Sequence, residues 1–329
     1  MTRVYVEPTG ESRALAAAEL HAAAEALDGV DTEALPGLLA VDLPDRAAAE
    51  LLARRLALGR RCLVEVDGPS MIEAAERRGA DHAGASVRRL GRPSGGRTDA
   101  TVLEVGNAYV RGGGSIDLDQ PARRLWIGED TAGRERLLEE VATTSRPTLM
   151  RRRISLLPFQ RPIGLDPRLA RAAANLARIR LGDRVLDPFL GTGALLAEAG
   201  LLGARLYGID RDPAMVRGAL QNLAFLGLSA EEVIEGDAGS VSFADRSLRF
   251  DALLTDPPYG RASGTGGEDA SALVGRVIPR WADRVRPGGR LVVVSPGGED
   301  AVGRPWHREL SVPVRVHRSL TREFRVYAR

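Results

Sequence analysis

The chain contains, at residues 185–194, the sequence Val-Leu-Asp-Pro-Phe-Leu-Gly-Thr-Gly-Ala, and this stretch decides the fold of its second half. A short apolar run ends at an aspartate, and a Gly-x-Gly turn then leads into an alanine- and leucine-rich segment. Glycine suits such a turn because it adopts backbone conformations that other residues avoid. The pattern therefore predicts a strand at residues 184–187 and a helix at residues 193–202, joined by a tight turn.

The same alternation of strand and helix continues on both sides of this stretch. Expected helices cover residues 168–179, 213–226 and 272–285, and expected strands cover residues 206–210, 233–235, 250–255 and 290–295. Residues 310–316 and 324–328 are expected to form an antiparallel pair at the sheet edge. Strands joined by helical crossovers predict a parallel, doubly wound sheet, so the fold class of residues 166–329 is α/β.

Residues 1–145 predict a smaller α+β region. We expect strands at residues 4–7, 37–43 and 62–67, helices at 11–27, 44–58 and 135–144, a basic loop at 86–97, and a hairpin of residues 101–105 and 108–110 that turns at Gly106-Asn107. Residues 146–165 carry Pro147, Pro158 and Pro162 beside the triplet at 151–153, three arginines in a row, and are expected to be a linker.

Composition limits the class of protein. The 329 residues carry a formal net charge of +2, and all basic residues are arginine. Residues 1–150 carry 19 arginines and 24 acidic residues, whereas residues 151–329 carry 27 and 20. The basic second half fits a nucleic-acid partner without requiring one, and a GC-rich genome also favours arginine.

The sequence lacks the patterns of membrane proteins, disulfide-rich proteins and metal sites. No run of about 18 apolar residues predicts a membrane span, and the N-terminus does not resemble a signal peptide, so we expect a cytoplasmic protein without a membrane partner. The single cysteine, Cys62, excludes an internal disulfide framework. The four histidines do not stand at ligand spacing, so we expect no metal. We expect a monomer.

The turn at residues 187–193 is suited to a cofactor. Gly191 and Gly193 let the backbone approach a ligand closely, and a helix N-terminus offers free N–H groups to an anion. That anion is either the pyrophosphate of a dinucleotide or the methionine carboxylate of S-adenosylmethionine. An acidic residue inside the turn, Asp187, disfavours pyrophosphate and suits the methionine ammonium.

Two further acids follow the next expected strands. Asp210 lies about 20 residues after the glycine turn, where an acid commonly binds ribose hydroxyls. Asp237 follows the third strand and is expected to accept from the adenine amino group. One such acid alone would be an ordinary surface carboxylate, but three at consecutive strand ends converge on one crevice. The residues expected to bind the cofactor are Asp187, Phe189, Gly191, Thr192, Gly193, Asp210, Asp237 and Ala238.

The sequence Thr255-Asp-Pro-Pro-Tyr-Gly260 directly follows the expected strand at 250–255. Proline has no N–H, so the carbonyl oxygens of this turn are free to face a cavity. An exocyclic NH2 of a base would donate to the Asp256 carboxylate and the Pro257 carbonyl, which aims the nitrogen lone pair at a methyl group. Tyr259 would stack on the extruded base, an interaction worth about 1–3 kcal/mol. The expected catalytic residues are Asp256, Pro257, Pro258 and Tyr259.

These two motifs carry a family resemblance. The sequence from Asp256 to Tyr259 resembles the [Asn/Asp/Ser]-Pro-Pro-[Tyr/Phe] motif of amino-methyltransferases that act on DNA, RNA and proteins, and the turn from Asp187 to Gly193 resembles their cofactor motif. A narrower likeness is to the archaeal tRNA guanosine-10 N2-methyltransferases. It rests on residues 161–171, Asn175-Leu176, the Asp-Pro-Pro-Tyr-Gly-Arg run that ends at Arg261, and residues 317–322. Residues 52–58 and 114–121 look like segments of a THUMP region.

The resemblance implies three parts: a ferredoxin-like and THUMP RNA-binding region at residues 1–145, a linker at 146–165, and a Rossmann-like methyltransferase domain at 166–329. It implies S-adenosylmethionine as cofactor, tRNA as substrate, and mono- or dimethylation of guanosine 10 by direct transfer. The chain departs from the family at Leu190, where relatives often have cysteine, at Ala174, where valine is common, and in its acidic first half. The alternatives are a tRNA guanine-N2 methyltransferase for position 6, a DNA or RNA adenine-N6 methyltransferase, and a non-catalytic RNA-binding module.

Overall fold

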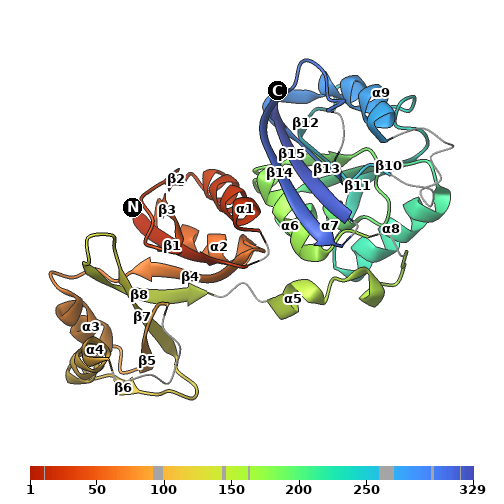
Figure 1. The fold of residues 1–329 in the computed structure, drawn as a ribbon. Helices are drawn as coiled ribbons and strands as arrows, with labels where there is room; N and C mark the ends of the chain where they lie inside the picture. Colours follow the sequence, from red (N-terminus) through yellow and green to blue (C-terminus); the bar gives the residue numbers. More distant parts are fainter. Residues whose placement is uncertain are drawn as a thin grey trace. The chain divides into compact units, whose positions relative to one another are not determined.

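The computed structural model describes residues 1–10, 12–91, 99–142, 146–161, 164–258, 270–297, 300–318 and 320–329 (Figure 1). The chain divides into two compact units. The first unit contains Met1–Gly10, Leu27–Arg54 and Gly59–Thr144, and the second contains Glu11–Ala26, Arg55–Leu58 and Ser145–Arg329. None of the helices in the described ranges is long and apolar enough to span a membrane.

The second unit is built on a seven-stranded sheet in the order β11-β10-β9-β12-β13-β15-β14. Its strands are β9 (Arg184–Asp187), β10 (Arg205–Asp210), β11 (Ala230–Glu235), β12 (Phe250–Thr255), β13 (Val285–Pro296), β14 (His307–His317) and β15 (Leu320–Ala328). The pairs among β9 to β13 are parallel, and β15 runs antiparallel to both β13 and β14. The expected α/β class and the antiparallel pair at the edge are confirmed.

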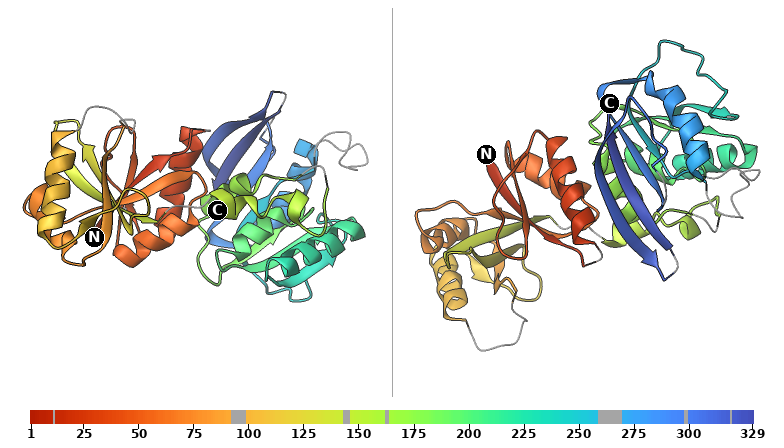
Figure 2. Two further views of the ribbon diagram at one scale, coloured as in Figure 1. Left: turned by 90° about the horizontal axis from the view of Figure 1, so that it is seen from below. Right: turned by 45° about the horizontal axis from the view of Figure 1, so that its top comes forward.

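Helices cover both faces of this sheet (Figures 1 and 2). They are α6 (Pro167–Leu176), α7 (Ala194–Gly200), α8 (Pro213–Phe225) and α9 (Ala270–Ala282), and the short helices α5 (Arg146–Met150) and η1 (Ile154–Leu156) precede them. Helix α9 packs Val277 and Trp281 on one face, against Leu253 and Phe250 of β12. Successive strand residues alternate between faces, so Ala252 and Leu254, the buried neighbours of Leu253, point to the face that α6, α7 and α8 cover. A register shift between Phe250 and Ala252 allows Phe250 to lie on the same face as Leu253.

Helix α1 (Arg13–Glu25) belongs to the second unit by its contacts. Its Glu19 is fully buried, and the carboxylate accepts hydrogen bonds from the backbone N–H groups of Ala57 and Leu58 and from Asn175 on α6, at 2.7–2.9 Å. Asn175 in turn accepts from Arg55 Nε at 2.7 Å. Burial raises the pKa of the Glu19 carboxyl group. This buried polar network ties residues from the start of the chain to α6.

The first unit contains an eight-stranded sheet in the order β2-β3-β1-β4-β8-β7-β5-β6. Its strands are β1 (Thr2–Pro8), β2 (Val30–Asp31), β3 (Leu39–Leu43), β4 (Gly59–Glu65), β5 (Gly84–Arg89), β6 (Ser115–Ile116), β7 (Arg123–Glu129) and β8 (Glu135–Ala142), and its helices are α2 (Arg46–Arg55), α3 (Met71–Gly79) and α4 (Ala100–Arg111). Helices α3 and α4 pack together with Ala75, Val105 and Tyr109 buried against Leu125 of β7. Helix α3 and strand β7 were not expected from the sequence.

The expected hairpin at residues 101–110 is wrong, because these residues form helix α4. Asp99 begins the helix by accepting hydrogen bonds from the N–H groups of Thr101 and Val102. Val105, Ala108 and Tyr109 are buried with helical spacing. The Gly106-Asn107 pair that suggested a turn lies inside the helix, where tertiary packing outweighs the low helix propensity of glycine.

The expected helix at 135–144 is also wrong, because residues 135–142 form strand β8 between β4 and β7. Leu137 and Leu138 are both buried, one on each face of the sheet. Glu139 is buried as well, and its carboxylate accepts from Arg46, Arg78 and Arg123. Two buried faces remove the alternation that marks a strand in sequence.

The expected basic loop at 86–97 lies partly in strand β5, and residues 92–98 are outside the described part. Arg89, on this strand, forms ion pairs with Asp99 and Glu135, at 2.5 and 2.6 Å. Arg88 is exposed. The two neighbouring arginines therefore differ in their availability to a partner.

Candidate active site

The predicted acidic residues meet at one edge of the seven-stranded sheet. Asp187 and Asp210 are the last residues of β9 and β10, Asp237 follows β11 by two residues, and Asp256 directly follows β12. These four strands are neighbours in the order β11-β10-β9-β12, and they run parallel. Ligands of doubly wound sheets bind outside the carboxyl ends of the strands. The fold thus places the four carboxylates where such a ligand binds.

Asp187 links the glycine turn to the Asp-Pro-Pro segment. Its Oδ1 accepts from Phe189 N and from Thr255 Oγ1, each at 3.0 Å. The side chain is almost completely buried. Burial raises its pKa to about 8, and the negative charges of Asp256 and Asp210 contribute in the same direction. A cationic group at this edge would therefore be favoured by the ionised carboxylate.

The glycine turn adopts a conformation that requires its glycines. Gly191 has φ of +53° and Gly193 has φ of +81°. Within the described ranges, a Cβ on Gly191 would meet only the Phe189 carbonyl oxygen, at 3.8 Å, so packing against the described residues does not explain this glycine. Thr192 is buried, and its carbonyl accepts from Asn222 Nδ2 of α8 at 3.1 Å. Phe189 packs against the core beneath α9.

Asp210 and Asp237 are already engaged by the protein. Asp210 accepts from the N–H groups of Gly191 and Asp212 at 2.8 and 2.9 Å, and burial raises its pKa. Asp237 accepts from Gly239 N at 2.8 Å and pairs with Arg276 of α9 at 3.0 Å; the Gly239 bond and, to a smaller extent, Arg276 lower its pKa. Ala238, beside it, is buried in the core under α9.

Asp256 holds its two carboxylate oxygens in different environments. Oδ2 accepts from Arg322 Nη1 of β15 at 2.6 Å, whereas Oδ1 is buried and has no hydrogen-bond partner among the described residues. Burial raises the pKa of this carboxyl group, and Arg322 opposes the shift. Pro257 is buried and Pro258 is partly exposed. The expected stacking residue Tyr259 lies outside the described residues.

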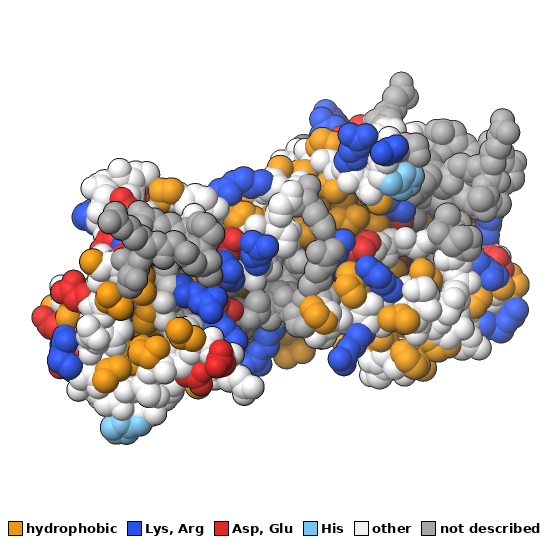
Figure 3. Space-filling view, turned by 60° about the horizontal axis from the view of Figure 1, so that its bottom comes forward, with side chains coloured by type: hydrophobic (Ala, Val, Ile, Leu, Met, Phe, Trp, Pro, Cys, Tyr) orange, Lys and Arg blue, Asp and Glu red, His pale blue; other side chains and the backbone are white. Residues whose placement is uncertain are grey.

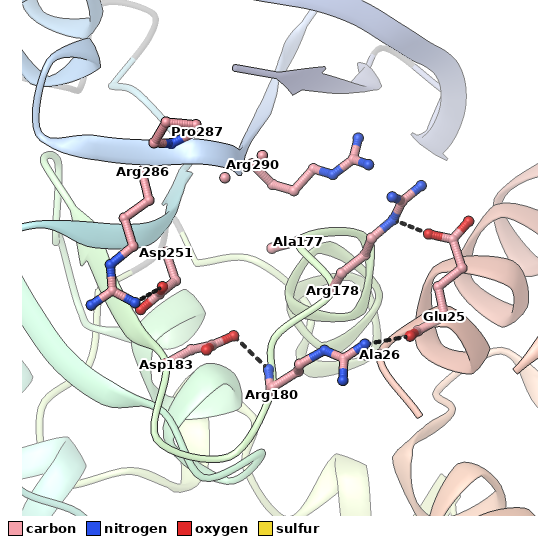
Figure 4. A pocket seen from close by; sticks show the side chains of 12 residues that line it. Glu25, Ala26, Ala177, Arg178, Arg180, Asp183, Asp251, Arg286, Pro287 and Arg290 are labelled. Atoms are coloured by element: carbon pink, nitrogen blue, oxygen red, sulfur yellow. Dashed lines mark hydrogen bonds and ion pairs between the residues drawn. The ribbon is translucent and has the colours of Figure 1, made fainter. Parts of the chain in front are cut away.

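The described part of the chain also has a cavity of about 310 Å³ at the amino ends of the parallel strands, opposite the predicted acids (Figure 4). Its lining includes Asp183, Asp251 and Arg286, which stand at the amino ends of β9, β12 and β13. Two of its arginines are paired with acids: Arg178 with Glu25 at 2.5 Å and Arg286 with Asp251 at 2.6 Å. The cavity is therefore separate from the crevice that the sequence motifs mark.

Two arginines at the candidate site, Arg276 and Arg322, were missed by the sequence analysis. Arg276 is 39 positions from Asp237, and Arg322 is 66 positions from Asp256. Arg322 ends the tail segment 317–322 that carried part of the family resemblance, which was the available signal. The described residues contain no group of three or more histidine, cysteine, aspartate or glutamate side chains that could hold a metal ion.

Known proteins share this fold. TrmN from Thermus thermophilus matches with a TM-score of 0.50 and 23% identity over all of both chains, which supports the fold alone. Residues 155–304 match the family described as RMKL-like, methyltransferase domain.

Sequence relatives narrow the family. The tRNA (guanine(10)-N2)-dimethyltransferase of Methanothermobacter thermautotrophicus is 34% identical over 220 residues, which are 65% of this chain and 63% of that protein. A relative from Methanothermococcus thermolithotrophicus is 33% identical over 170 residues, which are 49% of this chain and 97% of that protein. The chain spans 63%, 58% and 51% of three longer archaeal relatives. By these matches, the chain belongs to the family of the archaeal tRNA (guanine(10)-N2)-dimethyltransferases.

Proposed function

We propose that this protein transfers a methyl group from S-adenosylmethionine to N2 of guanosine 10 in tRNA. The observation that carries the proposal is Oδ1 of Asp256 at the carboxyl end of β12, which is buried and has no hydrogen-bond partner among the residues that the structure describes. A buried acceptor without a donor is costly, so such an atom indicates a ligand with an N–H to offer. An exocyclic amino group of a base is such a donor.

The residues at this edge fit the proposed cofactor. S-adenosylmethionine, when bound, supplies an electrophilic methyl group on a positively charged sulfur. The ionised Asp187 would hold its ammonium group, Asp210 its ribose hydroxyls and Asp237 its adenine amino group, with Phe189, Gly191, Thr192, Gly193 and Ala238 along the cofactor. Four carboxylates at one edge favour a cationic cofactor over a pyrophosphate. The open space at Gly191 agrees with a ligand that passes close to the backbone.

The base would be positioned by two acceptors. Its amino group would donate one hydrogen bond to Asp256 Oδ1 and one to the Pro257 carbonyl, with Pro258 fixing the turn and Tyr259 stacking on the ring. This arrangement directs the nitrogen lone pair at the methyl carbon. Transfer would form the carbon–nitrogen bond as the carbon–sulfur bond of the bound cofactor is broken, with the electron pair left on sulfur, and the methylated amino group would then lose a proton to water. Positioning supplies most of the acceleration.

We propose that residues 1–145 form the RNA-binding region, of ferredoxin-like and THUMP type, with residues 146–165 as linker and 166–329 as the methyltransferase domain. Arg88 and Arg124 are exposed on the paired strands β5 and β7 and point to the same face of the sheet. Such arginines fit backbone phosphates. Arginine and acidic side chains are interspersed on the face in Figure 3, so RNA contact would depend on local groups rather than on net charge. We also propose that the protein works as a cytoplasmic monomer.

The proposal is tested with Asp256→Ala in the full chain. Alanine removes the oxygen that accepts the amino group, so kcat should fall by about 100-fold or more while the Kd for S-adenosylmethionine stays the same. Asp251→Ala is the matched control, because Asp251 stands on the same strand at its amino end. It should leave kcat unchanged. An Asp256→Ala enzyme with wild-type kcat would exclude the assigned role.

A further inference from the structure

The ion pair between Arg322 and Asp256 joins two distant parts of the chain at the candidate site. Arg322 lies near the start of β15, opposite Pro296 at the end of β13. Its side chain is 7% exposed, and its Nη1 donates to Asp256 Oδ2 at 2.6 Å. An arginine buried to this degree needs a compensating charge. The pair therefore fixes where the Asp256 carboxylate lies.

The pairing makes the two oxygens of Asp256 unequal. Arg322 occupies Oδ2, and Oδ1 is left buried without a partner in the described part of the chain. A carboxylate that is held at one oxygen by a charged hydrogen bond has little freedom to rotate. The acceptor offered to a base is thus a single atom in a defined direction.

We propose that Arg322 is a positioning residue for methyl transfer: it orients Asp256 and keeps it ionised, so that Oδ1 accepts the amino group of the target base. This inference rests on the proposed function. Burial alone would favour the protonated acid, whose O–H is a donor and opposes an N–H donor. Arginine serves here because its guanidinium stays charged at every relevant pH.

Few charged groups lie near Asp256 among the described residues. Arg322 on β15 stabilises its ionised form, and burial acts in the opposite direction. Asp187, at the end of β9, is the neighbouring acid, and its own pKa is raised by burial first and then by the charge of Asp256. Removal of Arg322 would leave Asp256 and the neighbouring Asp187 without the cation that stabilises the ionised form of Asp256. The pKa of Asp256 would therefore rise.

Strand β15 offers a matched control. Arg325 is also 7% exposed, but it pairs with Glu323 on its own strand. Arg325→Met removes a buried arginine from β15 without touching Asp256, so it reports the structural cost of such a loss. Arg322→Met removes the partner of Asp256 at similar size, and Arg322→Lys keeps the charge.

The test is the pH profile of kcat/KM for tRNA, together with the titration of Asp256 by carboxyl carbon NMR, for wild type and the three variants. Arg322→Met should lower kcat at pH 7 by at least about 10-fold, leave the Kd for S-adenosylmethionine unchanged, and move the acid limb and the Asp256 titration upward by about one pH unit or more. Arg322→Lys should restore the wild-type acid limb in part. Arg325→Met should keep the wild-type profile.

Equal profiles for wild type and Arg322→Met would overturn the proposal, as would a loss of kcat in Arg325→Met as large as that in Arg322→Met. If Arg322→Met does not fold, the neutral Arg322→Gln takes its place: a kcat and acid limb that match those of Arg325→Met would overturn the role. Failure of the proposed function is distinguishable, because the wild-type chain would then not methylate tRNA. The NMR titration of Asp256 would still respond to Arg322.

Discussion

The substitution Asp187→Asn should stabilise the cofactor-free protein and weaken the binding of S-adenosylmethionine. Both observed donors to this side chain, Phe189 N and Thr255 Oγ1, bond to the same oxygen, Oδ1. An amide oxygen can accept both bonds, so the turn should survive. The substitution removes the buried negative charge.

The size of the effect follows from the pKa of about 8 for Asp187, against an ordinary value near 3.8. Because the folded state binds the proton more tightly than the unfolded state, the free energy of unfolding falls as pH rises from about 4 to about 8, by at most about 1.4 kcal/mol per pH unit. Asp187→Asn should remove this loss. Its Tm without cofactor at pH 8.5 should exceed that of the wild type, and the two should converge towards pH 4.

Cofactor binding should show the opposite dependence. If the ionised carboxylate holds the methionine ammonium, S-adenosylmethionine binding below pH 8 should release a proton, and the Kd should improve by up to about 10-fold per pH unit from pH 6 to pH 8. Titration calorimetry in two buffers with different ionisation enthalpies measures both quantities. Asp183→Asn, at the opposite end of β9, is the control. The pH dependence of its Kd and its proton release should match those of the wild type. A pH-independent wild-type Kd without proton release would show that the ionised Asp187 carboxylate does not hold the ammonium group.

Three further predictions concern the cofactor, the fold and the RNA. Asp210→Ala should raise the Kd for S-adenosylmethionine by about 10- to 150-fold, measured by calorimetry, because it loses a charge-assisted bond; an unchanged Kd would remove Asp210 from the site. Asn175→Ala should lower the free energy of unfolding by about 2–4 kcal/mol in urea, since Glu19 loses a buried partner; a change below 0.5 kcal/mol would contradict this. Arg88→Ala with Arg124→Ala should raise the KM for tRNA, by a larger factor at low salt than at high salt, and leave the cofactor Kd unchanged.

The second half of the chain was predictable because its strands are short apolar runs that stop at acids or glycines. The expected strands at 184–187 and 250–255 coincide with β9 and β12. Once these strands are parallel neighbours, Asp187 and Asp256 must meet at the same edge, so the core of the candidate site followed from sequence order.

The first half was less predictable because local signals there conflict with packing. Gly106-Asn107 indicates a turn in isolation, but Asp99 caps a helix whose buried face includes Tyr109. In β8, Leu137 and Leu138 are adjacent and both buried, so no alternation marks the strand. The partners of the site acids could not be predicted either. Arg322 lies 66 positions from Asp256, and in a chain with arginine throughout, none stands out before the sheet is assembled.

Methylation of guanosine 10 at N2 is tested most simply by nucleoside mass spectrometry of a tRNA transcript after incubation with the full chain and labelled S-adenosylmethionine. We expect label in N2-methylguanosine or N2,N2-dimethylguanosine, which is lost when guanosine 10 is replaced by adenosine and retained when guanosine 6 is replaced. Label in N6-methyladenosine would contradict the claim for guanine N2. Undiminished incorporation into the transcript without guanosine 10 would contradict the claim for its position.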